Sequence, residues 1–162
     1  MICDDPTVDI TVVIPAYNEE ERLPTMLSEC LESLETSKTE TYEVIVVDDG
    51  SKDKTSAYVL EMAKENSHLK CLKLIKNRGK GHAVKMGMMA ARGRHIFFAD
   101  ADRAMPFPEF QKIYKRYKDS IENYADLIVV GSRAHLEKVF LPLSNLSTEH
   151  NYNGVDTHCK KN

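Results

Sequence analysis

The sequence predicts an α/β fold, in which a mostly parallel sheet has helices on both faces. One observation behind this prediction is that short apolar segments alternate with segments of helical periodicity from residue 10 to residue 130. A second is that these segments are apolar throughout, as expected for strands that are covered on both sides. Right-handed crossovers between such strands would bring the loop after each strand to one edge of the sheet.

Five segments rich in apolar and β-branched residues are expected to form the strands. In chain order they are Ile10–Ile14, Tyr42–Val47, Cys71–Ile75, Ile96–Phe98 and Leu127–Val130. Pro15 is expected to stop the first strand, because proline cannot donate to a strand ladder. The fourth segment is expected to be a buried strand that delivers the acidic residues after it to the carboxyl edge of the sheet.

Four segments with apolar residues at helical spacing are expected to form helices. They run from Ala16–Glu20 to about Leu34, from Thr55 to Asn66, from about His82 to Arg92, and from beyond Pro108 to Ile121. One face of the first carries Leu23, Met26, Leu27, Cys30, Leu31 and Leu34. In the second we expect Ala57, Leu60 and Ala63 to be buried and Asp53 to be the N-cap. Gly93 is expected to end the third at its C-cap position.

Length and charge restrict the classes of protein. A chain of 162 residues is the size of one domain, which buries roughly 70% of its unfolded surface. Its 22 basic and 25 acidic residues give a net charge of -3, so there is no general electrostatic case for binding nucleic acid or an anionic membrane. We expect residues 1–138 to form the domain and residues 139–162, which are polar and without periodicity, to form a loosely ordered tail.

The cysteines and the apolar runs indicate the kind of cellular compartment, reducing or oxidising, and the relation to a membrane. The four cysteines form no Cys-x-x-Cys pair, which argues against a zinc site or a disulfide framework and fits a reducing environment. No apolar run reaches the roughly 18 residues of a membrane-spanning helix, and the first residues lack the order of a signal peptide. We therefore expect this chain alone to be soluble. The cysteines are Cys3, Cys30, Cys71 and Cys159.

Two carboxylates follow the fourth predicted strand in the motif Asp100-Ala101-Asp102. Aspartates at this spacing can share Mg²⁺ or Mn²⁺ and the oxygens of a diphosphate, because these cations prefer oxygen ligands and keep positions for phosphate. Taken alone, the same pattern is typical of a strand followed by a polar turn. The loops that follow the other strands decide between the two interpretations.

The loops after the first two strands carry groups suited to a nucleoside. Tyr17 offers a ring on which a base can stack, and Glu19 a carboxylate for ribose hydroxyls, although the segment is equally typical of a helix N-terminus. Asp48 and Asp49 are adjacent, so strand alternation points them to opposite sides. One of the two could accept from the imide N–H of uracil, while Asp48 is expected to brace the turn.

Two cationic groups follow the third and fifth strands. Gly79-Lys80-Gly81 precedes a helix and is typical of a phosphate cradle, although the Walker A pattern is not satisfied. Arg133 is either a diphosphate clamp or a surface charge. Each motif is ambiguous alone, but together they place a nucleotide-diphosphate site at one edge of the sheet.

Five ordered motifs between residues 10 and 138 carry a resemblance to a known family. They are Val13–Glu20, Tyr42–Asp53, Asn77–Gly81, Ala99–Asp102 and Gly131–Lys138. On these motifs the chain resembles GT-A glycosyltransferases of family 2, and among them the group that glucosylates dolichyl phosphate. The last motif is the one that separates the glucosyl from the mannosyl dolichol enzymes. The resemblance implies a Rossmann-like fold for transfer from a nucleotide-diphospho-sugar.

The resemblance also implies an activity. It predicts a hexosyltransferase that moves glucose from UDP-glucose to dolichyl phosphate, with inversion, for protein N-glycosylation at the cytosolic face of the endoplasmic reticulum membrane. Asp100 and Asp102 would be the catalytic residues and would bind Mg²⁺ or Mn²⁺, with Asp102 the main ligand. The residues expected to bind the nucleotide sugar are Pro15, Ala16, Tyr17, Glu19, Val47, Asp49, Lys80, Ala101 and Arg133.

The chain departs from the family pattern at three places. His82 replaces a second glycine after Gly81, and Arg103–Pro106 replace the usual residues after the aspartates. The similarity stops after Lys138, whereas family members continue into an acceptor-binding half with membrane segments, so the chain resembles a truncated product. The alternatives are a noncatalytic UDP-sugar-binding remnant and a mannosyltransferase-like enzyme. A phosphatase is disfavoured because Arg103 and Ala104 follow the aspartates.

Overall fold

The computed structural model describes residues 6–36, 40–101, 107–121, 128–131, 138–141 and 155–157. The chain divides into two compact units, Met1–Phe107 and Pro108–Asn162, and each is described by itself. The first unit contains four of the five predicted strands and three of the four predicted helices, and the domain boundary expected at residue 138 stays a prediction.

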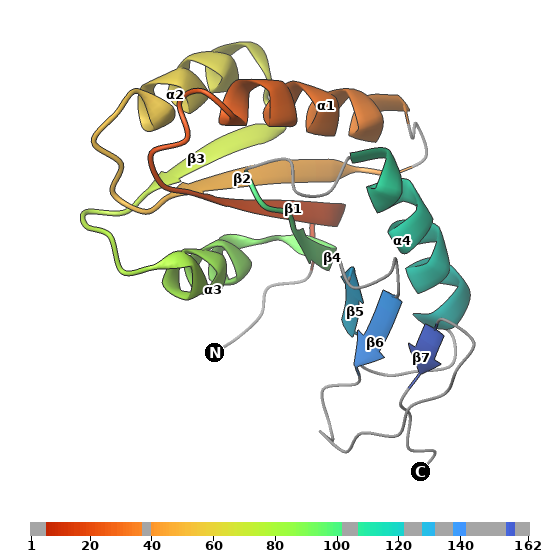
Figure 1. Ribbon diagram of the computed structural model, residues 1–162. Helices are drawn as coiled ribbons and strands as arrows, with labels where there is room; N and C mark the ends of the chain where they lie inside the picture. The colour runs from red at the N-terminus through yellow and green to blue at the C-terminus, as the bar shows by residue number, and fades with distance from the viewer. Residues whose placement is uncertain are drawn as a thin grey trace. The chain divides into compact units, whose positions relative to one another are not determined.

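A four-stranded parallel sheet forms the centre of the first unit, in the order β3-β2-β1-β4. Its strands are β1 (Val8–Ala16), β2 (Tyr42–Asp48), β3 (Leu69–Lys73) and β4 (Gly93–Phe98). Helices α1 (Leu23–Thr36) and α2 (Thr55–Glu65) cover one face and α3 (Lys80–Ala90) covers the other (Figure 1). The predicted fold class, with helices on both faces of a mostly parallel sheet, is confirmed.

The register of the sheet sorts its side chains into two cores. Val13 lies beside Ile45 and Pro15 beside Val47, so these positions share a face. On that face Val13, Ile45 and Val47 form a core with Ala83 of α3. The opposite face lies against α1, whose buried residues are Leu23, Met26, Leu27, Cys30, Leu31 and Leu34, the set that helical spacing predicted.

Two predicted boundaries in the first strand and helix were wrong. Pro15 does not stop β1, which continues to Ala16. The pairing of β1 with β4 ends at Val13, so the position of Pro15 has no ladder partner on that side, and its missing N–H costs nothing there. Helix α1 begins at Leu23, because side chains of the loop after β2 bind the backbone N–H groups of residues 18 to 20.

The buried side of α2 was also predicted incorrectly. Thr55, Ser56 and Val59 are buried, whereas Ala57 is exposed and Leu60 is 50% exposed. Hydrogen bonds at the start of the helix set this rotation: the hydroxyl of Thr55 donates to Asp53 Oδ1 and accepts from the N–H of Glu19. The position expected to be the N-cap therefore lies one residue too early, and Lys54, which makes no side-chain cap bond, occupies the N-cap.

Two further boundaries moved for reasons of packing. The strand β3 ends at Lys73, and Ile75, expected within it, is fully exposed. Gly93 is the first residue of β4 and not the cap of α3, whose C-cap is Ala91. A Cβ atom at Gly93 would lie 2.5 Å from the backbone N of Thr11, so this glycine is required by the close approach of two strands.

The prediction of a wholly buried fourth strand was wrong. β4 is the last strand of the described four-stranded sheet, and its residues alternate between partly buried and exposed. Ile96 is 42% exposed and Phe98 is 48% exposed. An edge strand pairs on one side only, which explains why an apolar run need not be buried on both faces.

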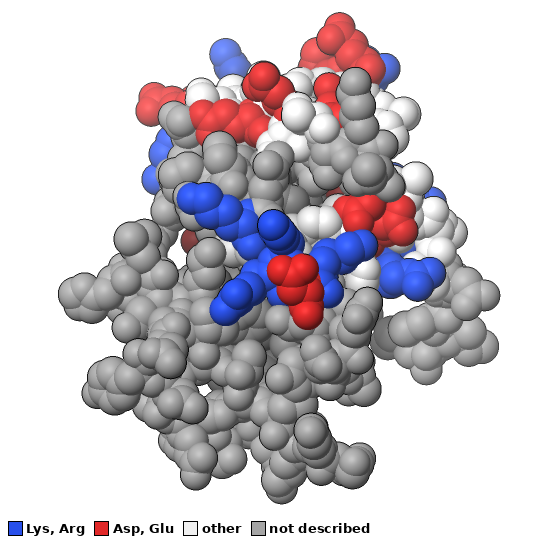
Figure 2. Space-filling model, turned by 90° about the vertical axis from the view of Figure 1, so that its right-hand side faces the viewer, with Lys and Arg blue, Asp and Glu red and all other residues white. Residues whose placement is uncertain are grey.

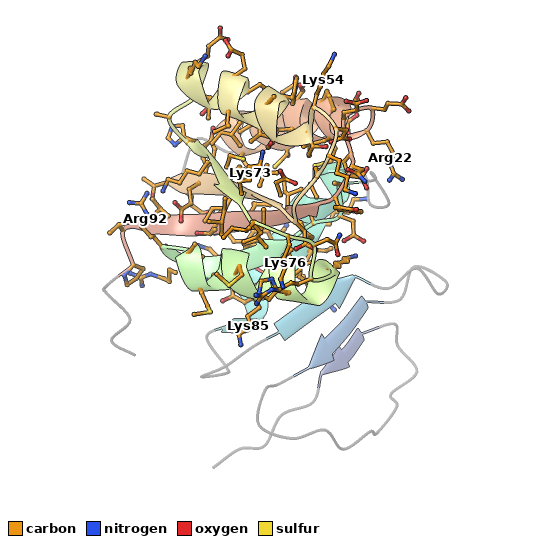
Figure 3. The ribbon with its side chains drawn as sticks, turned by 90° about the vertical axis from the view of Figure 1, so that its left-hand side faces the viewer. Arg22, Lys54, Lys73, Lys76, Lys85 and Arg92 are labelled. Atoms are coloured by element: carbon orange, nitrogen blue, oxygen red, sulfur yellow. The ribbon has the colours of Figure 1, made fainter. Side chains whose placement is uncertain are left out.

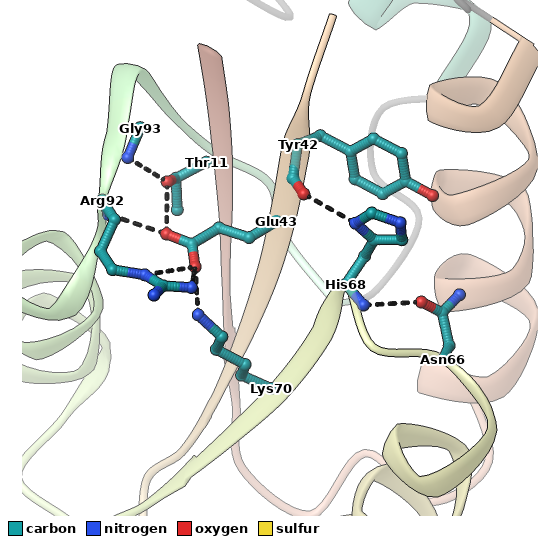
Figure 4. Close-up of polar contacts among 8 residues, drawn as sticks. All are labelled: Thr11, Tyr42, Glu43, Asn66, His68, Lys70, Arg92 and Gly93. Atoms are coloured by element: carbon teal, nitrogen blue, oxygen red, sulfur yellow. Dashed lines mark hydrogen bonds and ion pairs between the residues drawn. The ribbon is translucent and has the colours of Figure 1, made fainter. Parts of the chain in front are cut away.

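A charged group is buried at the amino end of the sheet (Figure 4). Glu43 is 2% exposed and accepts hydrogen bonds from the Thr11 hydroxyl at 2.9 Å, from the Arg92 backbone N–H at 2.7 Å and from Lys70 at 2.5 Å. Burial opposes ionisation, but the hydrogen bonds from Lys70, Arg92 and Thr11 outweigh it and lower the pKa of Glu43. The carboxylate thus ties four elements together.

The second unit holds the remaining elements. Strand β5 (Ile128–Gly131) pairs antiparallel with β6 (Lys138–Leu141), and β7 (Val155–Thr157) pairs parallel with β6. The prediction of a fifth strand in the parallel sheet was therefore wrong, because β5 belongs to a separate three-stranded sheet. Pairing between neighbouring segments closes only a short loop, which favours it over a distant partner.

Helix α4 (Phe107–Ile121) begins at the boundary of the two units and is strongly amphipathic. Ile113 is buried, while Lys112, Lys115, Arg116 and Lys118 are exposed. Lys and Arg side chains therefore gather over this helix (Figure 2). The sequence predicted the helix and its apolar positions, of which Ile113 is confirmed as buried.

Cys30 and Cys71 are free thiols, and Cys30 is fully buried. Cys3 and Cys159 lie outside the described residues. Within the described ranges, no helix combines the length and the apolar character needed to cross a membrane.

Candidate functional site at the carboxyl edge of the sheet

The loops that follow β1, β2, β3 and β4 meet at the carboxyl edge of the parallel sheet. Figure 3 shows the two ends of this sheet, with Arg22, in the loop after β1, at one end and Arg92, before β4, at the other. The predicted site residues Tyr17, Asp49, Lys80 and Asp100 follow β1, β2, β3 and β4, respectively, with Lys80 at the first position of α3. The topology therefore brings together the motifs that sequence spacing could only place one by one.

The loop after β1 presents an aromatic ring and a carboxylate. Tyr17 is 42% exposed, so its ring is accessible to a ligand. Glu19 accepts from Arg22 at 2.6 Å through Oε1, while its buried Oε2 has no hydrogen-bond partner within the described residues. Asn18 adopts a left-handed φ of 54°, which directs the chain away from the strand and toward the loop after β2.

Hydrogen bonds connect the loop after β1 with the loop after β2. The N–H of Asn18 donates to Ser51 Oγ, and the Asn18 Oδ1 accepts from the N–H of Lys52. The N–H of Glu19 donates to Thr55 Oγ1 at 2.9 Å. The bonds to Thr55 and to the Glu20 N–H lower the pKa of Asp53 against the opposing effect of burial. Asn18, Ser51 and Thr55 were not among the predicted site residues, although small polar residues after strands are typical of such turns.

A pocket of about 370 Å³ lies beside these loops, but its charge disfavours a phosphate. Four of the six residues that line it are acidic, and like charge repels an anionic ligand. A cationic group such as Lys80, which does not line this pocket, is better suited to a diphosphate. The lining residues are Asn18, Glu19, Glu20, Glu21, Arg22 and Asp53.

The two acids that end β2 have different partners. Asp48 is fully buried, and its Oδ1 accepts from the N–H of Ser51 at 2.8 Å, so the prediction that it braces the turn is confirmed. Asp49 is also buried and accepts from the backbone N–H of Arg78 at 3.1 Å and of Gly79 at 2.7 Å. The carboxylate of Asp49 therefore fixes the loop that leads into α3.

Gly50 allows the loop after β2 to approach that same loop closely. Its φ is +75°, and a Cβ atom there would lie 2.8 Å from the backbone N of Asn77 and from the carbonyl carbon of Lys76. Only glycine satisfies both the left-handed conformation and this close backbone contact. The turn after β2 thus positions the phosphate cradle through Gly50 as well as through Asp49.

Lys80, the first residue of α3, reaches the loop after β4. Its Nζ lies 2.5 Å from Asp100 Oδ1, and this pair joins the predicted phosphate-binding lysine to the predicted metal-binding motif. The backbone N–H groups of Lys80 and Gly81 have no acceptor within the described residues, as is usual at a helix start. The helix dipole, these N–H groups and the ammonium together favour an anion at this position.

The residues at the end of β4 fit a hard divalent cation. Asp100 Oδ1 is buried and, apart from its ion pair with Lys80, lacks a hydrogen bond. Carboxylate oxygens are the ligands that Mg²⁺ and Mn²⁺ prefer, with water and phosphate completing the shell. No cluster of three His, Cys, Asp or Glu side chains forms in the described part of the chain. Asp102 and Arg133, predicted to take part, lie outside it.

Four other predicted site residues form the floor of the site. Pro15, Ala16, Val47 and Ala101 are all buried, and Val47 packs beneath α3 in the core. The carbonyl oxygen of Ala16 accepts from the N–H of Asp49 at 2.9 Å, so β1 also holds the second acid in place. These residues shape the edge of the sheet, and their contact with a nucleotide stays a prediction.

With the exposed tyrosine, the buried acid and the lysine at a helix start located at this sheet edge, the chain can be compared with known families. The family model of glycosyl transferase family 2 matches residues 11–153. The chain belongs to glycosyl transferase family 2. The match includes all four strands of the parallel sheet except the first residues of β1 and extends into the second unit.

Two family 2 relatives are dolichyl-phosphate beta-glucosyltransferases. The Drosophila melanogaster enzyme is 49% identical over 141 residues, which cover 83% of this chain and 43% of the relative. The Homo sapiens enzyme is 45% identical over 145 residues, which cover 85% of this chain and 44% of the relative. The chain thus spans less than half the length of these curated relatives.

The fold of family 2 is also found among solved structures. The chain superposes on TarS residues 1–349 from S. aureus with a TM-score of 0.56 and 23% identity, covering 88% of this chain and 38% of TarS. The complex of the same protein with UDP gives a TM-score of 0.50 and 25% identity over 68% of this chain and 33% of TarS. The predicted GT-A fold is confirmed by this likeness.

Proposed function

We propose that the chain binds UDP-glucose and that it forms the donor half of an inverting glucosyltransferase whose acceptor is dolichyl phosphate. One observation supports this proposal above the others: Tyr17, Asp49, Lys80 and Asp100 follow four parallel strands of one sheet, so they lie at the edge where open α/β sheets bind their ligands. The names of the family 2 relatives support the sugar and the lipid, and the TarS complex supports UDP.

In the proposed complex the uridine lies against the loops after β1 and β2. The exposed ring of Tyr17 stacks on the base, and Glu19 accepts from the ribose. Asp49 accepts from the imide N–H of uracil while it keeps its bonds to the Arg78 and Gly79 N–H groups. A carboxylate has about four acceptor positions, so both sets of bonds are compatible.

The diphosphate lies between the start of α3 and the end of β4. Lys80 and the N–H groups of α3 bind its oxygens, with Arg133 as a further cation. Asp100 and Asp102 would hold Mg²⁺ or Mn²⁺, which would neutralise charge on the departing UDP.

The reaction needs little beyond alignment, because a phosphate oxygen is already a nucleophile. In the proposed transfer, an oxygen of dolichyl phosphate forms a bond to the anomeric carbon of glucose from the side opposite UDP. The bond from that carbon to the UDP oxygen breaks, and the electron pair leaves with UDP, so the configuration inverts. Holding the two reactants in line supplies most of the rate.

The substrate and the compartment are parts of the same proposal. A lipid acceptor requires the protein to work at a membrane surface, and we place it, as an enzyme of protein N-glycosylation, at the cytosolic face of the endoplasmic reticulum. Protease protection and fractionation of the tagged chain test that location. A chain recovered in full from the supernatant of sedimented microsomes would contradict it.

Binding and transfer are measured separately. We expect UDP-glucose, titrated calorimetrically with Mn²⁺ present, to bind more tightly than GDP-mannose, and Asp102→Ala to abolish the metal-dependent part. Transfer of labelled glucose to a dolichyl-phosphate analogue then tests the enzyme. If UDP and Mn²⁺ binding survive undiminished in Asp102→Ala, the site assignment fails. A preference for GDP-mannose would identify the mannosyl alternative.

A second candidate function is donor binding without transfer. The described part of the chain supplies groups for a nucleotide diphosphate, and none of its residues has been assigned to the lipid phosphate. Tight binding of UDP-glucose with no labelled lipid formed, under conditions in which a full-length relative turns over, would favour this candidate over the enzyme.

A further inference from the structure

The ion pair between Lys80 and Asp100 joins two groups that the proposed function uses for different ligands. Nζ of Lys80 lies 2.5 Å from Oδ1 of Asp100, and within the described residues this oxygen has no other polar partner. Among the described residues, no second cation contacts Asp100. The first aspartate of the Asp-x-Asp motif is therefore paired with the lysine that the proposed function assigns to the diphosphate.

The exposure of the pair makes it exchangeable. The side chain of Lys80 is 58% exposed and that of Asp100 is 28% exposed. An ion pair this open to water changes an equilibrium constant by about five-fold at most, because solvent screens it and ordering a long side chain costs entropy. The pair is strong enough to orient the ammonium but weak enough to yield to a divalent cation.

The backbone beneath Lys80 is fixed although its ammonium is not. Asp49 holds the N–H of Gly79 at 2.7 Å, and the carbonyl oxygen of Gly79 accepts from the N–H groups of His82 and Ala83. The lysine ammonium is a point charge on a flexible four-carbon stem. It can therefore move within the reach of its side chain while the helix start stays in place, where the N–H groups of Lys80 and Gly81 find no acceptor among the described residues.

We infer that Lys80 is an exchangeable counter-ion, which neutralises Asp100 in the metal-free protein and passes to the donor diphosphate when a divalent cation binds Asp100. Metal and donor then bind cooperatively, because the metal frees the ammonium that the donor needs and the donor removes the competitor of the metal. The inference rests on the proposed function, but its tests separate the two.

The first test is a calorimetric titration with Mn²⁺ alone. Lys80→Met removes the competitor, so we expect Mn²⁺ to bind about two- to five-fold more tightly than to the wild type. Lys85→Met is the control, because Lys85 is an exposed lysine of the same helix (Figure 3) and no contact to Asp100 is found for it. Lys80→Arg, which keeps the charge, should bind Mn²⁺ like the wild type. Equal Mn²⁺ affinity in the Lys80→Met and Lys85→Met variants would overturn the inference.

The second test measures UDP binding without metal, where we expect removal of the Asp100 charge to raise the affinity for UDP. Asp100→Asn releases Lys80, so metal-free UDP should bind about two- to five-fold more tightly than to the wild type. The double variant Asp100→Asn with Lys80→Met should lose this gain. The inference about Lys80 is wrong if the tighter UDP binding persists in the double variant. It is also wrong if Asp100→Asn shows no tighter binding although the wild type binds UDP with Mn²⁺, and in both cases the proposed function stands. If the wild type binds no UDP with Mn²⁺, the proposed function fails, and the titration with Mn²⁺ alone still decides the exchange.

Discussion

Gly87 controls how closely α3 packs against the sheet, and its substitution by alanine is a sharp test of that packing. A Cβ atom at Gly87 would lie 2.3 Å from Cγ1 of Val13 and 2.9 Å from Cγ2 of Val47. Carbon atoms in contact prefer about 3.5–4.0 Å, so the helix must lift or two stiff β-branched side chains must move. Both valines are fully buried, so neither has room to turn away.

The expected magnitude comes from two opposing effects. Overpacking costs about 1–3 kcal/mol, and the severity of this overlap argues for the upper end. Alanine also gains about 1 kcal/mol over glycine in a helix. We therefore expect Gly87→Ala to lower the free energy of unfolding by about 2 kcal/mol, or the Tm by about 4–8 °C for a protein of this size.

Gly81→Ala is the matched control, because both glycines lie in α3. No atom lies within 4 Å of a Cβ placed at Gly81, so this change should leave stability unchanged or raise it by up to about 1 kcal/mol. Urea denaturation followed by circular dichroism measures both variants. A double-mutant cycle of Gly87→Ala with Val13→Ala should give a coupling of at least about 1 kcal/mol. Equal stability of the Gly81→Ala and Gly87→Ala variants, or a coupling near zero, would refute the close packing of α3.

Three further predictions concern buried groups. Because the pKa of Glu43 is lowered, its stabilisation is present above the unfolded pKa of about 4.3 and is lost as pH falls through the lower folded value. Urea melts from pH 3 to 7 should therefore show a steeper acid loss in the wild type than in Glu43→Gln, which should be about 1–3 kcal/mol less stable at pH 7; parallel curves would contradict this. Asp49→Ala should weaken UDP binding by about ten-fold or more, since it removes an acceptor for two backbone N–H groups and for the base, whereas calorimetry should show an unchanged Mn²⁺ affinity; wild-type UDP binding would argue against the assignment. Burial raises the pKa of the Cys30 thiol, and burial with the nearby Asp48 carboxylate raises that of Cys71, so native thiol labelling at pH 8 should be slow at both and slowest at Cys30. Rapid labelling of Cys30 before unfolding would show that the buried face of α1 is not packed against the sheet.

The sequence predicted what depends on local periodicity. The buried face of α1 follows from apolar residues at helical spacing, and the six predicted positions are the buried ones. The alternation of strands and helices likewise led to the parallel sheet. The face of α2 could not be obtained in this way, because Thr55 and Ser56 are polar and are buried through bonds to other loops and elements.

Contacts between distant residues account for the other errors. Glu43 stands near the start of a mostly apolar strand, and its partners Lys70 and Arg92 follow 27 and 49 residues later. Gly93 resembled a helix cap, but it is glycine because Thr11 of the neighbouring strand lies against it. Neither relationship leaves a trace in local sequence.

The candidate site was predicted as a set of separate motifs but not as a network. Strand ends and parallel topology were enough to assign Tyr17, Asp49, Lys80 and Asp100 to one edge. The contacts between these residues, such as the hydrogen bond from the Gly79 N–H to Asp49 and the ion pair of Lys80 with Asp100, depend on loop conformations. Asn18 and Gly50 set those conformations through positive φ angles, which residue spacing does not reveal.

The hydrogen bonds between the loops after β1 and β2 limit how the donor site can be re-engineered. The backbone N–H of Lys52 donates to the Asn18 side chain, and the N–H of Lys54 donates to the Glu20 side chain. The conformation of each loop therefore depends on the other. A graft that exchanges residues 17–22 for those of another transferase, without residues 49–54, would leave both loops without their partners. Recombination between such enzymes should therefore preserve specificity only when the two segments travel as a pair.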